Sequence, residues 1–318
     1  MNHSTCSLAT WAVAIGLVLG GSAFAAEDQG VSGGDENDVV RSPDVIPFEE
    51  APSHIFLTRE EYDFRLFREP LARHNVNMTY HGGKIMTTAV TKAIFWGTSW
   101  GSYTGDKITG MDTWYSGFNG SNYAKTSDEY TGSNGQVGPT TTHQGHLIDT
   151  SAASGGGNTS VILAEVCKVI TSPDPSGIGY YAVYSDVKRG SAGYCAWHSA
   201  GTCGGQLVQF AFFFNLDGDP GCDPGDSSGL HSQGLAALAN VSGHELSEAR
   251  TDPASPGAWY DSQGQENGDK CAWTFNVPLV TFSNGTQWKI QGEWSNAAYT
   301  AKTGYSNSSG QNGCLDGH

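Results

Sequence analysis

Residues 234–251 form the strongest predicted helix in the chain, and most of its length offers no polar side that could face water. Residues 234–243 carry no charge. Small and apolar side chains follow two opposite stripes, which are Leu235, Leu238, Ser242 and Leu246 on one side and Ala237 and Val241 on the other. A helix that is apolar on both sides is usually buried, so the rest of the chain is expected to enclose it. Pro253 ends the pattern.

The end of this helix carries the residues that most suggest chemistry. His244 and Glu248 are four positions apart, so they project from one helix face and could bind one metal ion. Glu245 lies one step round the helix and could act as general base by holding a water against that ion. This is the logic of the metallopeptidase HExxH motif, with Glu in place of the second His. A structural buried network and a solvated face are the alternatives for these three residues.

A catalytic zinc site needs a third protein ligand. Glu266 and Asp269 lie downstream at the kind of spacing that glutamate-type zinc peptidases use, and Asp252 is the next choice. The proline that follows Asp252 could bend this residue away from the site. An acidic loop pinned by Cys271 is the alternative interpretation of Glu266 and Asp269. We therefore predict a zinc site at His244 and Glu248 that one of the three carboxylates completes.

Other acidic residues and histidines give weaker signals. Residues 217–226 alternate Asp with Gly and Pro and could bind calcium, but they lack the EF-hand spacing, and a solvated turn is the preferred interpretation. His81 and His198 are isolated histidines, which are expected to be structural. Ser199 has no nucleophile-elbow sequence around it, which argues against a serine triad.

The first residues predict export. The apolar run over residues 8–19 is too short to span a bilayer, and Ala23-Phe24-Ala25 gives the pattern that signal peptidase reads. We expect residues 1–25 to be a signal peptide that is cleaved after Ala25. No later segment is apolar enough for a membrane span. The expected product is secreted, and either extracellular or associated with a cell wall.

Charge and composition separate the next segment from the rest. Residues 26–75 open with an acidic stretch rich in Gly and Pro and are predicted to be a linker or prosegment. A short helix is expected within it, because Thr58 and Glu61 fit a capping box and Pro70 ends the pattern. The whole chain has a formal net charge of -16, from 16 Lys and Arg against 32 Asp and Glu, which makes nucleic acid a poor partner.

Residues 76–318 are expected to form one α+β domain. Beside the buried helix, alternating or aromatic-rich stretches predict strands, and periodic stretches predict further helices. The predicted strands are 84–96, 178–187 and 206–215, and the predicted helices are 112–123 and 160–170. A hairpin is expected over 278–294, around Asn284-Gly285. Together with the His-Glu-x-x-Glu helix, this mixture favours a single zincin-like domain with a mixed sheet and a buried active-site helix.

Cysteine usage agrees with an oxidising compartment. Of the 7 cysteines, Cys6 leaves with the signal peptide, and the others are Cys167, Cys195, Cys203, Cys222, Cys271 and Cys314. An even set with no CxxC pair favours disulfides over a zinc–thiolate site. Cys195 and Cys203 flank a Gly/Ser turn, so a local bridge is expected there. A second bridge, Cys271–Cys314, would tie the C-terminus beside the acidic loop.

Several short motifs occur in a fixed order across residues 78–318. They are Tyr80-His81-Gly82-Gly83, Tyr194-Cys195-Ala196-Trp197-His198-Ser199, His244-Glu245-Leu246-Ser247-Glu248 through Asp252-Pro253, Ala258-Trp259-Tyr260-Asp261 and Gly268-Asp269-Lys270-Cys271-Ala272-Trp273. Together they resemble the phosphate-induced protein 1, or EXORDIUM-like, family, and the His-Glu-x-x-Glu helix resembles its microbial branch. The resemblance makes residues 76–318 an EXORDIUM-like domain. It implies a secreted or wall-associated protein but no settled biochemical activity.

Two functions from different classes follow from these observations. The first is a secreted metal-dependent hydrolase, zinc peptidase-like, with His244 and Glu248 as ligands, Glu245 as general base and an extracellular peptide as substrate. The second is a non-enzymatic extracellular protein that binds a cell-wall component or signals, in which the same residues serve structure. Glu at the second ligand position favours the second function, and the buried helix favours the first.

Overall fold

The structure is a computed structural model that describes residues 51–68 and 76–318, all of which belong to one structural unit. The predicted signal peptide and the first part of the predicted linker lie outside these residues. The described part is a mixed α+β fold with five α-helices and a six-stranded mixed sheet. The expected fold class is therefore confirmed at this level. No helix of the described part is long and apolar enough to cross a membrane.

The six-stranded sheet forms the centre of the fold. Its strands, in spatial order, are β1 (His54–Leu57), β8 (Tyr194–Cys203), β9 (Gln206–Asn215), β7 (Gly179–Lys188), β3 (Ala89–Trp96) and β6 (Thr141–Asp149). The four strands from β9 to β6 run parallel, whereas β8 is antiparallel to β9 and β1 is antiparallel to β8. β7 and β9 are buried along most of their length, as their near-continuous aromatic and apolar sequences require.

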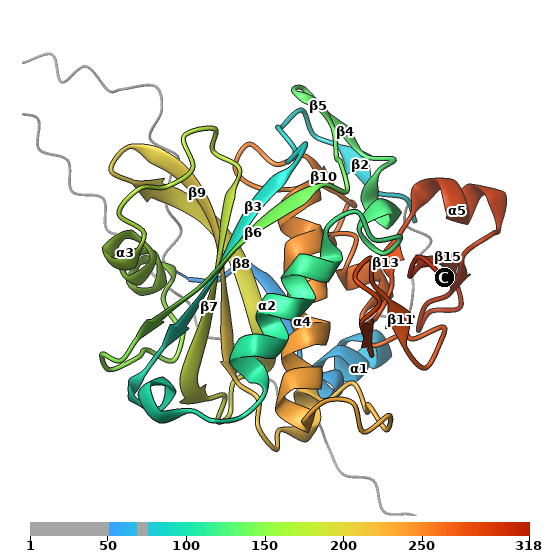
Figure 1. Ribbon diagram of the computed structural model, residues 1–318. Helices are drawn as coiled ribbons and strands as arrows, with labels where there is room; N and C mark the ends of the chain where they lie inside the picture. Colours follow the sequence, from blue (N-terminus) through green and yellow to red (C-terminus); the bar gives the residue numbers. More distant parts are fainter. Residues whose placement is uncertain (1–50, 69–75) are drawn as a thin grey trace, which may run out of the picture. The chain divides into compact units, whose positions relative to one another are not determined.

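Helices cover both faces of this sheet. α2 (Lys107–Phe118) and α4 (Gln233–Thr251) lie on one face, and α3 (Thr159–Val169) lies on the other (Figure 1). Every residue of α4 after Gln233 is buried, which confirms the prediction from its uncharged sequence. Ser232 caps its N-terminus by accepting the N–H of Leu235.

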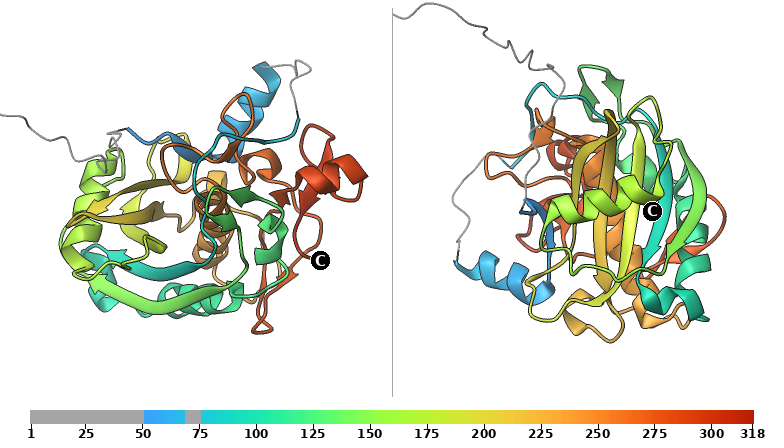
Figure 2. Two further views of the ribbon diagram at one scale, coloured as in Figure 1. Left: turned by 90° about the horizontal axis from the view of Figure 1, so that it is seen from above. Right: turned by 90° about the vertical axis from the view of Figure 1, so that its left-hand side faces the viewer.

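The C-terminal part of the chain encloses α4 from the side opposite the sheet (Figures 1 and 2). It consists of short strands and one short helix, which are β10 (Trp259–Tyr260), β11 (Val280–Thr281), β12 (Gln287–Trp288), β13 (Glu293–Trp294), α5 (Asn296–Ala301), β14 (Tyr305–Ser306) and β15 (Asn312–Leu315). Three further short strands, β2 (Thr79–Tyr80), β4 (Thr131–Gly132) and β5 (Gly135–Gln136), complete the described strands. α4 is thus enclosed, and its polar side chains after Gln233 are buried.

The predicted elements agree with the structure where the local signal is strong. β9 has the predicted bounds, and β11 and β12 pair as a hairpin around Asn284-Gly285. The strand predicted from residue 84 begins only at Ala89, and the helix predicted from residue 112 begins at Lys107. Strand β8 was not predicted, because its Ala, Ser, Gly and His residues show no clear alternation.

The segment assigned to a linker or prosegment contributes directly to the sheet. Strand β1 pairs with β8, and α1 (Arg59–Arg68) follows it. The predicted helix start is confirmed, since Thr58 Oγ1 accepts the N–H of Glu61 at 3.3 Å. The folded unit therefore includes residues well before the predicted boundary at residue 76.

One of the two predicted disulfides is wrong. Cys271–Cys314 is present, but the other bridges are Cys167–Cys203 and Cys195–Cys222. Cys195 and Cys203 stand near opposite ends of strand β8. At about 3.3 Å per residue they are roughly 26 Å apart, far beyond the reach of a disulfide. The error arose because the segment between them was read as a turn.

Candidate metal centre

His54 and His198 lie side by side because β1 pairs with β8. They are directly opposite each other in the antiparallel register, so both side chains project from the same face of the sheet. Their ring centroids are 4.7 Å apart. This face is the one that α4 covers, and the His198 side chain is only 2% exposed.

Glu266 reaches both histidines from the loop between β10 and the 3-10 turn η4 (Asp269–Cys271). Its Oε2 atom lies 2.7 Å from Nδ1 of His54 and 3.3 Å from Nε2 of His198. Its Oε1 atom is buried and has no hydrogen-bond partner among the described residues. Burying a carboxylate oxygen without a partner is costly, and a bound cation is one way to satisfy it.

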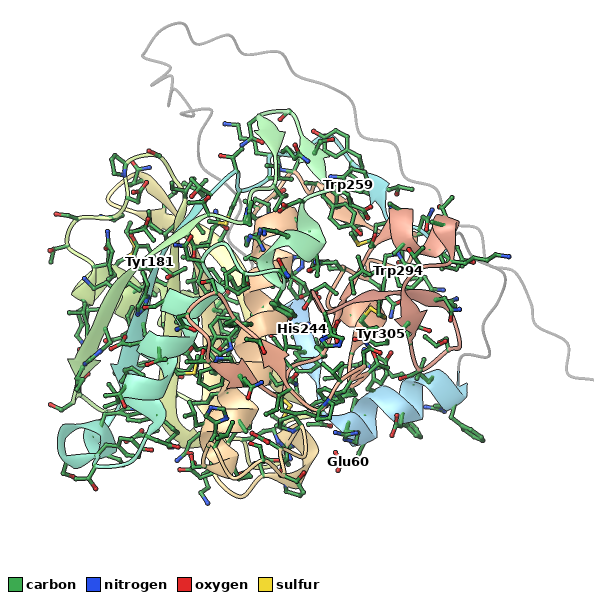
Figure 3. The ribbon with its side chains drawn as sticks, turned by 45° about the vertical axis from the view of Figure 1, so that its right-hand side comes forward. Glu60, Tyr181, His244, Trp259, Trp294 and Tyr305 are labelled. Atoms are coloured by element: carbon green, nitrogen blue, oxygen red, sulfur yellow. A yellow bond between two sulfur atoms is a disulfide. The ribbon has the colours of Figure 1, made fainter. Side chains whose placement is uncertain are left out.

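The ligands predicted on and after α4 form a second group. Nε2 of His244 lies 3.1 Å from Oε1 of Glu248 and 3.8 Å from Oδ1 of Asp269. The structure thus brings three predicted ligands together. The His244 side chain lies between α4 and the C-terminal segments that carry Trp294 and Tyr305 (Figure 3). Glu248 links the two groups, since its Oε2 atom lies 3.5 Å from Nε2 of His198.

Gln291 determines which ring nitrogen of His244 carries the proton. Its Nε2 donates to the carbonyl of Gly268 at 2.9 Å, and its Oε1 accepts from the N–H of Trp273 at 3.3 Å, so the amide orientation is defined. The same Nε2 lies 3.1 Å from Nδ1 of His244. Because an amide NH2 group only donates, Nδ1 must accept, and the proton of neutral His244 stands on Nε2.

This protonation disfavours His244 as a metal ligand. Nε2 is the nitrogen that faces Glu248 and Asp269, and a ligand nitrogen must offer a lone pair. The charge of Glu248 overcomes burial and raises the pKa of His244 to about 10, but a second ring proton would point at the Gln291 amide. Ligation through Nε2 requires that Gln291 turn its amide and lose both of its backbone hydrogen bonds.

Glu245 is also close to the row of histidines and carboxylates. It could form a third ligand group with His198 and Glu248. The side chain is fully buried, and within the described ranges neither of its oxygens has a hydrogen-bond partner. Burial raises its pKa well above the ordinary value for a glutamic acid, so the isolated side chain favours the neutral form.

His54 and Glu266 shift each other's pKa through their opposite charges. Burial alone would raise the pKa of Glu266, but the neighbouring His54 and His198 outweigh it and hold this pKa below its usual range. Burial alone would lower the pKa of His54, but the charge of Glu266 and its hydrogen bond raise it. The pair is therefore able to exist as a hydrogen-bonded ion pair when no cation is bound.

A cavity of about 290 Å³ opens onto the two histidines. Its wall includes His54, His198, Ser199, Asp252 and Tyr260. Asp252, a predicted ligand, belongs to this wall and accepts the N–H of Ala258 at 2.5 Å through Oδ1. Burial, with the charge of Glu266, raises the pKa of Asp252 to about 7. A carboxyl group with such a pKa can take up or release a proton near neutral pH.

His54, His198 and Glu266 form a second candidate set for a zinc-type ion, and unlike the predicted set it borders the cavity, through its two histidines. Tetrahedral zinc with bonds of about 2.0–2.2 Å separates its ligand atoms by about 3.3–3.5 Å. The 3.3 Å between His198 and Glu266 matches this, and the 2.7 Å between His54 and Glu266 would have to open by roughly 0.6 Å. Two imidazoles and one carboxylate are a known catalytic zinc set, and the cavity leaves the fourth position accessible.

Sequence reasoning missed His54 and His198 for different reasons. His54 lay in the segment interpreted as a linker, and His198 was interpreted as structural because no nearby residue suggested ligation. Residues 194–203 show no clear alternation, so no local signal placed His198 on a strand.

The acidic loop over residues 217–226 supports its interpretation as a turn rather than a calcium site. Asp217 binds Lys107 at 2.6 Å, and both carboxylate oxygens of Asp219 accept from Arg189. These carboxylates already have protein cations as partners. The ligand groups found among the described residues do not include this loop.

Comparisons with known proteins add no relative. No family model matches the chain, and neither a curated protein nor a solved structure matches it.

Proposed function

We propose that this protein is a secreted metal-dependent hydrolase whose zinc-type ion is held by His54, His198 and Glu266 at the inner end of the cavity. The observation that carries the proposal is the convergence of these three side chains beside an open cavity. When bound, such an ion supplies Lewis acidity and makes its bound water more acidic.

The chain offers two carboxyl groups for proton transfer at this site. Asp252 stands in the cavity wall, where a substrate can reach it, and this position favours it as the proton acceptor. Glu245, predicted for that role, is fully buried behind His198. We therefore assign proton transfer to Asp252 and a supporting role beside His198 to Glu245. A peptide or another hydrolysable wall component is the proposed substrate.

Two further observations are compatible with this proposal. Three disulfides suit a secreted protein. The mixed sheet, with antiparallel β8 beside the buried helix α4, is compatible with a zincin-like domain. Membership of the EXORDIUM-like family remains a proposal that rests on the sequence motifs.

One observation favours the alternative, a non-enzymatic extracellular binding protein. The 2.7 Å hydrogen bond between His54 and Glu266 satisfies one atom of each residue without any ion. In that case the row of histidines and carboxylates would be a structural network, and the cavity would be the binding site.

Metal analysis of the purified protein separates the two functions. We expect one zinc ion per chain after zinc loading and dialysis, lost in His198→Ala and Glu266→Gln but kept in Asp269→Asn. Asp269 is the matched control because it belongs only to the predicted His244 group. If zinc is lost in Asp269→Asn and kept in Glu266→Gln, the ion is bound at the predicted site on α4 instead. Absence of stoichiometric zinc from the wild-type protein would contradict the enzyme proposal.

A further inference from the structure

The three proposed ligands come from two parts of the chain. His198 and Glu266 belong to the body of the fold, whereas His54 belongs to the N-terminal segment, residues 51–68. His54 and Glu266 are 212 positions apart in the sequence. Binding of an ion would therefore tie this segment to the body.

β1 and the first residue of α1 make several specific contacts with the body. Phe56 stacks between the rings of His244 and Trp273, at centroid distances of 4.1 and 4.8 Å. The indole N–H of Trp273 donates to the carbonyl of Leu57 at 3.1 Å, and Arg59 donates to the carbonyl of Asp223 at 3.1 Å.

The rest of the segment is more exposed, although Tyr62 belongs to the core and Leu66 packs against it. Within α1 only Tyr62 is buried. Phe64 and Phe67 are 50% and 87% exposed. The strand that carries His54 is thus one point of attachment, and His54 stands at its first residue.

We propose that the ion clamps the N-terminal segment: a divalent metal ion bound at His54, His198 and Glu266 holds β1 on β8, and release of the ion loosens the segment. The inference rests on the proposed function for the position of the ion. It gives the segment a regulatory role, because access of metal to the site controls whether β1 and the cavity wall at His54 stay in place.

Thermodynamic linkage gives the size of the effect. An ion that needs all three ligands binds the protein tightly when β1 is docked on β8 and far more weakly when β1 is undocked. Docking then strengthens ion binding by the same factor by which the ion strengthens docking. At a free zinc concentration 100 times the dissociation constant, the undocked population should fall by about 100-fold.

Hydrogen exchange on the full-length secreted protein tests the clamp, with zinc as the ion and a chelator as its removal. In the wild-type protein, zinc should slow amide exchange over residues 54–58 by about 100-fold if β1 opens locally. His54→Ala should abolish this response to zinc. Ile55→Ala is the matched control, because the neighbouring side chain projects from the other face of β1. It should exchange faster overall and still respond to zinc.

The outcomes distinguish the clamp from the proposed function. If zinc binds stoichiometrically but exchange over residues 54–58 does not change, the clamp is refuted and the metal-dependent hydrolase stands. A zinc response in His54→Ala equal to that of the wild type refutes it as well. If no zinc binds to the wild-type chain, both proposals fall together.

Discussion

Replacement of Phe56 by alanine tests whether the N-terminal segment is part of the folded domain. Phe56 is 1% exposed and packs between two rings, those of His244 and Trp273. Burial of a phenylalanine side chain contributes about 1.5–3 kcal/mol by transfer from water. The cavity that alanine leaves adds to this loss, and such substitutions typically cost about 3–5 kcal/mol.

We expect the upper half of this range for Phe56→Ala, because its neighbours cannot easily close the gap. His244 is fixed on α4, and Trp273 follows the Cys271–Cys314 disulfide. For a domain of this size, 1 kcal/mol corresponds to about 2–4 °C, so the midpoint of thermal unfolding should fall by roughly 8–20 °C.

Urea unfolding followed by tryptophan fluorescence, in zinc-free buffer with the disulfides intact, measures this loss. Phe67→Ala is the control, since Phe67 lies in the same segment but is 87% exposed, and it should change the free energy of unfolding by no more than about 0.5 kcal/mol. If the two variants unfold at the same urea concentration, Phe56 contributes nothing to the fold. The segment would then be the linker that the sequence suggested.

Three further predictions test other parts of the structure. Replacing Cys195 and Cys222 together by serine should cost about 3.5 kcal/mol, from the loop-closure entropy of a 27-residue separation; non-reducing peptide mapping of the wild type should recover this pair, and a Cys195–Cys203 peptide would contradict the fold. The raised pKa of Asp252, about 7, means that the folded protein holds the carboxyl proton more tightly than the unfolded chain does. Protonation of Asp252 therefore makes its full contribution to the free energy of unfolding below about pH 4, and this contribution is lost as the pH rises to about 7. Between these pH values, the free energy of unfolding of Asp252→Asn should therefore rise by on the order of 4 kcal/mol relative to that of the wild type. Urea unfolding of the metal-free proteins measures this difference, and parallel pH profiles of their unfolding free energies would refute the pKa shift. Arg250→Ala should cost about 3–5 kcal/mol, because buried Arg250 donates to two backbone carbonyls that would lose their donor; equal urea midpoints for variant and wild type would show that the carbonyls find other partners.

Local patterns account for the parts of the fold that were predicted from sequence. The uncharged stretch of α4 required burial, since a helix without a polar face must be covered. The turn at Asn284-Gly285 and the cap at Thr58 depend only on residues a few positions apart. For the same reason His244 and Glu248, one helical turn apart, were correctly expected on one face and lie 3.1 Å apart.

The order and direction of strands decided the rest. His54 lies beside His198 only because β1 pairs with the edge of β8. No local sequence pattern predicts a pairing between residues so distant in the chain. The same directions separate Cys195 from Cys203 and bring each to a different partner.

The sequence alone therefore determined which helix is buried and which polar side chains it carries inward. It did not determine the ligand set, because ligation depends on distances of about 3 Å between side chains from separate elements. Those distances follow from the register of β1 on β8, from the loop that brings Glu266 beside them, and from the Gln291 amide that holds the proton of His244 on Nε2. Each of these is a contact between segments far apart in the chain, so it exists only in the tertiary structure.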